Sequence, residues 1–274
     1  MKIVMTLLVR NEDDIIRENL EYHLKNGVDY FLITDHHSRD NTLEIINEYV
    51  EKGVAEVRVE QSEEHHQAAW VTDMARRACV EHGADWVINN DADELWVPPK
   101  GNLKDFFEAV DPNVYKLHVS RFDFFYLPYD LAKFYEAMLF RETFRRWTKC
   151  CHRAVSDIVV EVGNHDANSE ILKDNLGLSV GAGNISIFHY PVRTVERYKA
   201  KMVEGTASVL GTPGIPAEMF FHWKRALRYI QDNNFEEYLR EFSRDRHQIN
   251  EGIQNGSILF DDTLQKFFYN LYNR

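Results

Sequence analysis

The chain has 274 residues and is poor in cysteine, proline and glycine, and these shortages exclude some classes of protein. Its cysteines are Cys79, Cys150 and Cys151, an odd number with two of them adjacent, which does not fit a disulfide framework. Consecutive residues of a strand point to alternating faces, so we expect Cys150, Cys151 and His152 to be buried side chains and not joint metal ligands. Only 7 prolines and 13 glycines argue against long disordered linkers.

Long hydrophobic runs and excess positive charge are lacking too. The apolar opening, residues 1–5, is too short for a signal peptide or a membrane span, which predicts a cytoplasmic protein with at most peripheral membrane contact. Lys and Arg number 32 against 44 Asp and Glu, and a net charge of −12 argues against nucleic acid as a partner. What is present is 44% hydrophobic and 13% aromatic residues, enough for a sizeable globular core.

Strand and helix patterns alternate through the first hundred residues. Apolar runs predict strands over 3–9, 30–34, 54–59 and 86–90, and spacings of three and four predict helices around 16–24, 42–52 and 67–82. This order predicts a doubly wound α/β sheet, in which ligands bind beyond the carboxyl ends of the strands. Three polar segments, 10–12, 35–41 and 91–94, follow such strands, so we expect them to converge on one edge.

The pattern is less regular after residue 100. We predict strands over 115–125, 138–151 and 185–190, followed by helices over 195–203, 217–232, 235–242 and 262–271. The expected organisation is an α/β domain over 1–194, with halves over 1–100 and 101–194, and a helical C-terminal extension over 195–274.

The acidic run Asp91-Ala92-Asp93-Glu94 follows an apolar strand directly. Two carboxylates at a strand end can offer hard oxygen ligands to Mg²⁺ or Mn²⁺, and such an ion also takes oxygens from a diphosphate. The alternative interpretation is a solvated acidic turn or a helix N-cap. We favour the metal because two other polar strand ends are expected at the same edge.

These segments resemble glycosyltransferases of family 2. The run Leu8-Val9-Arg10-Asn11-Glu12 is followed by Asp35-His36-His37-Ser38-Arg39-Asp40-Asn41-Thr42 and then by Asn90-Asp91-Ala92-Asp93-Glu94. The last two are similar to the D-x-x-S-x-D-x-T and D-A-D-E motifs of one branch, and His189-Tyr190-Pro191 resembles a later signature. The resemblance implies the GT-A fold, a mixed α/β sheet flanked by helices. It also implies that residues 1–194 are the catalytic domain, in which residues 1–100 would bind the nucleotide sugar and residues 101–194 the acceptor.

The resemblance also implies roles for individual residues. Asp91 and Asp93 would bind the metal and the diphosphate, with His189 completing the site, although His189 could equally be a packed strand-end histidine. Asp35 would contact the base or ribose. The remaining donor-site residues would be Arg10, Asn11, Glu12, Gln67 and Trp70.

A general base is harder to find, because the acidic pair expected just before a helix is absent. Family 2 enzymes invert the anomeric centre, so a carboxylate must accept the acceptor's proton. Our order of preference is Asp166, Asp123 and then Glu161. Lys149 or Arg146 could meet the diphosphate, while Trp147, Tyr126, Tyr129 and Phe144 could form an acceptor platform or part of the core.

The favoured function is metal-dependent transfer of a sugar, with inversion, from a UDP-sugar to a glycan or lipid-linked acceptor. One alternative is a nucleotidyltransferase acting on sugar phosphates, but the first strand is followed by an acidic turn instead of a glycine-rich loop with lysine. The other alternative is a nucleotide-sugar-binding module without catalysis.

Overall fold

The computed structural model describes residues 1–127, 133–144, 147–180, 184–216 and 219–273. The chain divides into two compact units. Unit 1 comprises residues 1–62, 66–121 and 145–188, and unit 2 comprises residues 63–65, 122–144 and 189–274. The sequence-based division at residue 194 stays a prediction. Tyr129, Arg146 and residues 217–218 of an expected helix lie outside the described residues.

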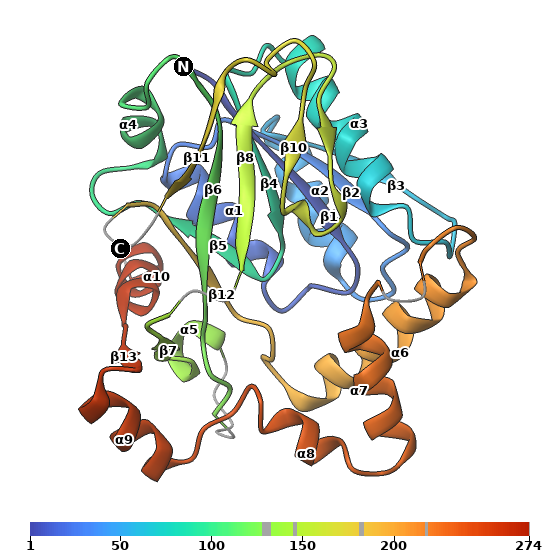
Figure 1. The fold of residues 1–274 in the computed structure, drawn as a ribbon, viewed down its shortest axis with the longest axis vertical. Coiled ribbons are helices and arrows are strands. Elements are labelled where there is room, and N and C mark those ends of the chain that lie inside the picture. The colour runs from blue at the N-terminus through green and yellow to red at the C-terminus, as the bar shows by residue number, and fades with distance from the viewer. Residues whose placement is uncertain (128–132, 145–146, 181–183, 217–218, 274) are drawn as a thin grey trace. The chain divides into compact units, whose positions relative to one another are not determined.

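The first half of unit 1 forms the predicted parallel sheet (Figure 1). β1 (Ile3–Val9) lies between β2 (Tyr30–Asp35) and β4 (Trp86–Asp91), and β3 (Ala55–Val59) pairs with β2. Successive side chains of β1 point to opposite faces, and both faces of this strand are buried. Burial on both sides explains why its sequence is almost continuously apolar.

Helices follow the first three strands, as the spacing of apolar residues predicts. They are α1 (Ile16–Lys25), α2 (Thr42–Glu51) and α3 (Gln67–Val80). α3 buries Val71 and Met74 in a cluster that includes residues of β1, β2 and β4. All strands and helices predicted before residue 91 are thus confirmed.

Antiparallel strands extend this sheet. β8 (Thr148–Arg153) pairs antiparallel with both β4 and β6 (Val114–Asp123). The strand order is β3-β2-β1-β4-β8-β6-β12-β5, and β11 pairs with β6. The remaining elements of unit 1 are β5 (Glu94–Val97), α4 (Leu103–Glu108), β9 (Val159–Val160), β10 (Ala167–Asn168), β11 (Leu176–Val180) and most of β12 (Ser186–His189). The predicted fold class, a mixed α/β sheet with flanking helices, is confirmed.

Unit 2 is mainly helical. Its elements are α5 (Phe134–Ala137), β7 (Phe140–Glu142), α6 (Val195–Gly211), α7 (Phe221–Gln231), α8 (Phe235–Leu239), α9 (Arg246–Asn255), β13 (Ile258–Phe260) and α10 (Thr263–Tyr272). The sequence analysis did not predict α9. Its signals are an Asp245–Gln248 capping box at the start and Gly256 in the left-handed region (φ 78°) at the end.

The single strand predicted over 138–151 is wrong. Its first part contains β7, which pairs with β13 in unit 2, while its last part begins β8 in the sheet of unit 1. Both parts are rich in apolar and aromatic residues, so the local pattern could not separate them. The strands with which they pair are distant in the chain, and only this pairing divides the segment.

Candidate functional site

The three polar segments of unit 1 meet at the carboxyl ends of β1, β2 and β4, as predicted. In the sheet register Val9 lies opposite Asp35, and Leu8 lies opposite Asp91. The N–H of Asn11 donates to Ser38 Oγ (3.0 Å). The backbone after β1 is therefore bonded directly to the turn after β2, which fixes the two segments side by side.

Asp35 is almost completely buried at the end of β2, with 1% of its surface exposed. Its Oδ1 accepts a hydrogen bond from the N–H of Ser38 (3.0 Å). Its Oδ2 is buried and has no hydrogen-bond partner among the described residues. A buried acceptor without a donor is costly, so this oxygen is suited to receive a donor from a ligand.

Aromatic rings and an amide lie near this strand end. The rings of His36 and the half-buried Trp70 have centroids 4.8 Å apart. Gln67, the first residue of α3, accepts a hydrogen bond at Oε1 from the N–H of Gly163 (3.1 Å). The predicted residues Gln67 and Trp70 therefore belong to one helix start, and Trp70 contacts the turn that begins with Asp35.

Buried side-chain amides hold the turn from Asp91 to Glu94. Asn19 Nδ2, on α1, donates to the carbonyls of Ala92 (2.9 Å) and Glu94 (2.9 Å). Asn90 Nδ2 also donates to the carbonyl of Glu94 (3.1 Å), and its Oδ1 accepts from Trp96 Nε1 (2.9 Å). Both asparagines are buried, so these bonds fix the backbone that carries the acidic side chains.

A buried histidine completes this network. His23 Nε2 accepts from the N–H of Trp96 (3.1 Å), and Nδ1 lies 2.8 Å from the carbonyl oxygen of Asn19. Burial lowers the pKa of His23 to about 3, so the ring is neutral. Asn19 and His23 were not predicted from the sequence. The sequence pattern that could have revealed them is a pair of polar residues four apart on the predicted helix around 16–24. A second polar pair, Asn89-Asn90, ends the neighbouring apolar strand.

Asp91 is surrounded by partners from other strands and loops. Lys149 Nζ on β8 forms an ion pair with Asp91 Oδ2 and lies 3.3 Å from Glu94 Oε1. Asn164 Nδ2 donates to Asp91 Oδ1 (3.1 Å), and Arg121 lies 3.4 Å from Glu94. Burial lowers the pKa of Lys149, but the charges of Asp91 and Glu94 outweigh this and raise it overall.

The carboxylates of this turn suit a hard divalent cation. The side chain of Asp91 is 30% exposed and can be reached from solvent. Each carboxylate oxygen has a second lone pair, so Asp91 can bind a cation while it keeps its contacts with Lys149 and Asn164. Together with Asp93, which is buried, it offers the oxygen ligands that Mg²⁺ and Mn²⁺ prefer.

His189 belongs to unit 2, where it pairs with Asp123. His189 Nδ1 lies 2.8 Å from Asp123 Oδ1, and both side chains are largely buried. When Nδ1–H donates to this carboxylate, Nε2 becomes the nitrogen that can bind a metal, and such pairing is common at metal-binding histidines. The structure thus brings together two residues that were predicted separately, one as a ligand and one as a base.

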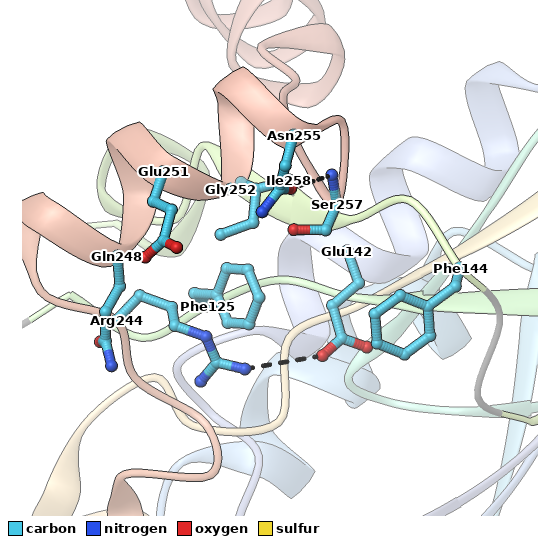
Figure 2. A pocket seen from close by; sticks show the side chains of 10 residues that line it. All are labelled: Phe125, Glu142, Phe144, Arg244, Gln248, Glu251, Gly252, Asn255, Ser257 and Ile258. Atoms are coloured by element: carbon cyan, nitrogen blue, oxygen red, sulfur yellow. Dashed lines mark hydrogen bonds and ion pairs between the residues drawn. The ribbon is translucent and has the colours of Figure 1, made fainter.

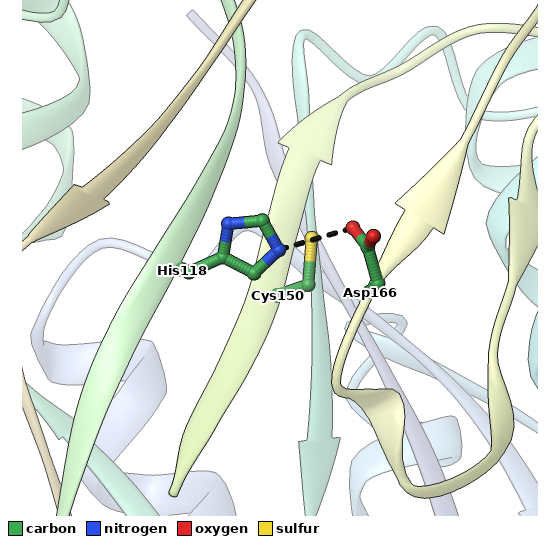
Figure 3. A group of neighbouring side chains, drawn as sticks. All are labelled: His118, Cys150 and Asp166. Carbon is green, nitrogen blue, oxygen red and sulfur yellow. Dashed lines mark hydrogen bonds and ion pairs between the residues drawn. The ribbon is translucent and has the colours of Figure 1, made fainter. Parts of the chain in front are cut away.

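A second group of potential ligands in unit 1 consists of His118 on β6, Cys150 on β8 and Asp166, which directly precedes β10 (Figure 3). However, Asp166 Oδ1 lies 2.6 Å from Lys116 Nζ as well as 3.0 Å from His118 Nε2. Burial raises the pKa of Cys150 to about 12, whereas a metal binds the thiolate. We therefore interpret this group as a lysine–carboxylate pair beside a buried thiol.

The three predicted bases have different surroundings. Burial raises the pKa of Asp166, but hydrogen bonds from Lys116 and the backbone outweigh this and lower it overall. Asp123 is held by His189, as described above. Glu161 is exposed and accepts a hydrogen bond from Asn168 (3.2 Å).

A separate cavity of about 260 Å³ lies within unit 2, between α9, β7 and β13 (Figure 2). Arg244 lies 3.9 Å from Glu142 across it, and its guanidinium is 4.4 Å from the centre of the Phe125 ring. Phe144, a residue of the predicted acceptor platform, lines this cavity. Because Glu142 and Phe125 both engage the guanidinium, the cation of this cavity is already neutralised within the protein.

Comparison with known proteins identifies the family. Residues 4–210 match glycosyltransferase family 92. The chain belongs to this family. The predicted enzyme class, a glycosyltransferase, is confirmed, and the family whose model matches is family 92. No curated protein matches the chain.

Three solved structures show limited similarity to this glycosyltransferase. S. aureus TarS (residues 1–349) shares 14% identity over 86% of this chain and 72% of its own, with a TM-score of 0.47. The mannosyltransferase PcManGT from Pyrobaculum calidifontis, in complex with GDP-Man and Mn²⁺, shares 13% over 86% and 72% (TM-score 0.44). Glucosyl-3-phosphoglycerate synthase from Mycobacterium tuberculosis, with Mn²⁺ and UDP, shares 16% over 44% and 44% (TM-score 0.32).

Among the residues that the structure describes, no helix combines the length and apolar character needed to cross a membrane.

Proposed function

We propose that this enzyme transfers a sugar from a nucleotide-sugar donor, a UDP-sugar first, to a glycan or lipid-linked acceptor, with Mn²⁺ or Mg²⁺ as cofactor. The observation that supports this best is the meeting of three polar strand ends in unit 1. One of them carries the Asp91–Glu94 turn, whose backbone is fixed by Asn19 and Asn90. A preorganised acidic turn at the ligand-binding edge of an α/β sheet suits a metal–diphosphate.

The nucleoside would bind beside the end of β2. Asp35 would accept a hydrogen bond from the base or ribose at Oδ2, the buried oxygen that lacks a donor among the described residues. Trp70, paired with His36, offers a partly exposed aromatic ring beside that turn. Of the other predicted donor-site residues, Arg10, Asn11 and Glu12 directly follow β1. Gln67 is the first residue of α3.

The diphosphate would bind at the acidic turn. Asp91 and Asp93 would hold the cofactor, which when bound supplies positive charge that offsets the charge of the departing nucleoside diphosphate. The sequence-based expectation that His189 completes the metal site stays a prediction. Asn19, Asn90 and His23 keep the turn in place. Because Asn19 and Asn90 donate to backbone carbonyls and His23 accepts from the N–H of Trp96, the carboxylates stay available to the ligand.

Of the first two carboxylates in our order of preference for the general base, Asp123 suits the role better than Asp166. A lowered pKa makes Asp166 a weak proton acceptor. Replacing the true base by asparagine should lower kcat by about 10²- to 10⁴-fold. Asp123→Asn separates two roles: loss of kcat with normal Mn²⁺ binding indicates a base, whereas loss of Mn²⁺ binding indicates that Asp123 positions His189.

Calorimetric titration with UDP, in Mn²⁺ and in EDTA, tests the proposal. We expect UDP to bind in Mn²⁺ and to bind at least about 10-fold more weakly in EDTA. Equal affinity in both would contradict the metal assignment, and lack of UDP and GDP binding in Mn²⁺ would contradict the donor site. Release of UDP from a panel of UDP-sugars then distinguishes an enzyme from a binding module.

A further inference from the structure

Lys149 is a buried cation in direct contact with the acidic turn. It lies on β8, next to β4, and only 2% of its surface is exposed. Its ammonium group contacts Asp91 Oδ2 and lies 3.3 Å from Glu94 Oε1, so it bridges the two ends of the acidic run. Lysine is rarely buried unless it is paired, which indicates that these two carboxylates hold it there.

In the ion pairs of this cluster, two carboxylates face two cations. Asp91 and Glu94 contribute two negative charges, and Lys149 and Arg121 contribute two positive charges. A divalent cation that binds Asp91 therefore arrives at a carboxylate whose charge is already countered by an ammonium group. At such short range and with little water between them, two cations repel each other strongly.

A diphosphate changes this balance because it brings several negative charges to the same place. The divalent ion and the ammonium group are then both attracted to oxygen atoms of the diphosphate. This attraction offsets the repulsion between the two cations. The lysine side chain is flexible and carries a compact charge with three donors, so it can turn from a carboxylate to a phosphate oxygen.

We infer that Lys149 couples metal binding to nucleotide binding: it weakens the binding of Mn²⁺ alone and strengthens the binding of Mn²⁺ together with a nucleoside diphosphate. The enzyme then takes up the ion mainly with its donor. This inference rests on the proposed donor site, and it adds a positioning residue that controls the order of binding.

Mn²⁺ titrations of the wild type and of Lys149→Met, with and without saturating UDP, test this inference. In the wild type we expect UDP to raise the Mn²⁺ affinity by about 10- to 100-fold, within the range of ordinary coupling between sites. In Lys149→Met, Mn²⁺ alone should bind about 5-fold more tightly, and the increase caused by UDP should fall by about 10-fold. Lys149→Arg keeps the charge and should keep most of the coupling.

The matched control is Lys116→Met. Lys116 is also a buried lysine of this sheet and is paired with Asp166 (2.6 Å), so its removal has a similar cost in folding. Its Mn²⁺ affinity and UDP coupling should equal those of the wild type, and circular dichroism checks that each variant is folded.

The outcomes separate the inference from the proposed function. Wild type that binds neither Mn²⁺ nor UDP would contradict both. Normal binding by the wild type, with unchanged coupling in folded Lys149→Met, would overturn the role of Lys149 alone. If Lys149→Met does not fold, Lys149→Arg provides the test. A Lys149→Arg variant that is as stable as the wild type, but in which UDP no longer raises the Mn²⁺ affinity, would overturn a role based on charge.

Discussion

Two buried lysines on adjacent strands, Lys149 and Lys116, form similar ion pairs with carboxylates. They differ in where those carboxylates lie in the fold. Lys149 contacts Asp91 and Glu94, which flank the turn at the end of β4. Lys116 contacts Asp166 and the carbonyl of Ala167 (3.0 Å), at the start of the short strand β10. The two lysines are thus chemically alike, whereas only one pair lies at the ligand-binding edge of the parallel strands.

This difference shows that a cluster of charged side chains does not by itself mark a site. His118, Cys150 and Asp166 lie close enough to share an ion, yet Lys116 already supplies the positive charge there. Asp91 is also paired with a lysine, but its turn is held by three buried side chains that bond to the backbone and not to the carboxylates. The position at the strand end, and the support beneath it, distinguish the two.

The largest expected difference comes from removing one carboxylate of each pair. Asp91→Asn should weaken Mn²⁺-dependent UDP binding by at least about 100-fold, or ~2.7 kcal/mol, because an amide is a poorer ligand for a hard cation. Asp166→Asn should leave this affinity unchanged. Titration calorimetry measures both, and equal losses in the two variants would contradict the distinction drawn above.

The support beneath the acidic turn should contribute strongly to stability. Asn19→Ala leaves the buried carbonyls of Ala92 and Glu94 without this donor and should lower the free energy of unfolding by about 1–3 kcal/mol. The control is Asn168→Ala, which removes an exposed amide beside Lys116 and should change stability by less than about 0.5 kcal/mol. Urea denaturation compares them. If Asn19→Ala lowers the free energy of unfolding less than Asn168→Ala does, Asn19 does not stabilise the acidic turn.

The same support predicts a pH dependence. The pKa of His23 is lowered to about 3 in the folded state, so below the ordinary histidine pKa of about 6.5 the unfolded chain binds the additional proton. Above that pKa, His23 does not change the free energy of unfolding with pH. Below it, the free energy of unfolding falls by about 1.4 kcal/mol per pH unit as the pH decreases toward the folded-state pKa. His23→Gln should reduce this slope between about pH 6 and pH 4. An unchanged slope in urea denaturation would contradict a buried neutral ring.

The smallest effect is expected at Asp35. Asp35→Asn keeps the shape of the side chain but replaces one acceptor oxygen by an N–H₂ donor, and it should weaken UDP binding by about 5-fold, or ~1 kcal/mol. The Mn²⁺ affinity without nucleotide should stay the same. Calorimetry that shows unchanged UDP affinity in the folded variant would leave Asp35 as a turn residue only.

Local sequence patterns are enough to predict the parallel part of the sheet and the edge where the proposed site lies. Strands buried on both faces must be apolar throughout, and helices on a sheet must be apolar at intervals of three and four. Polar segments that follow such strands necessarily reach the same edge. Arg10, Asp35 and Asp91 could therefore be placed together before any coordinates were known.

The side chains that support that edge and pair with its carboxylates are recognisable only in the folded chain. Lys149 is 58 residues from Asp91, and Asn19 is 73 residues from Ala92. Asp166, predicted as a base from its polar loop, meets a lysine 50 residues away. Ion pairs and amide–carbonyl bonds of this kind depend on which strands become neighbours. The local spacing of residues does not show which distant segments will pair.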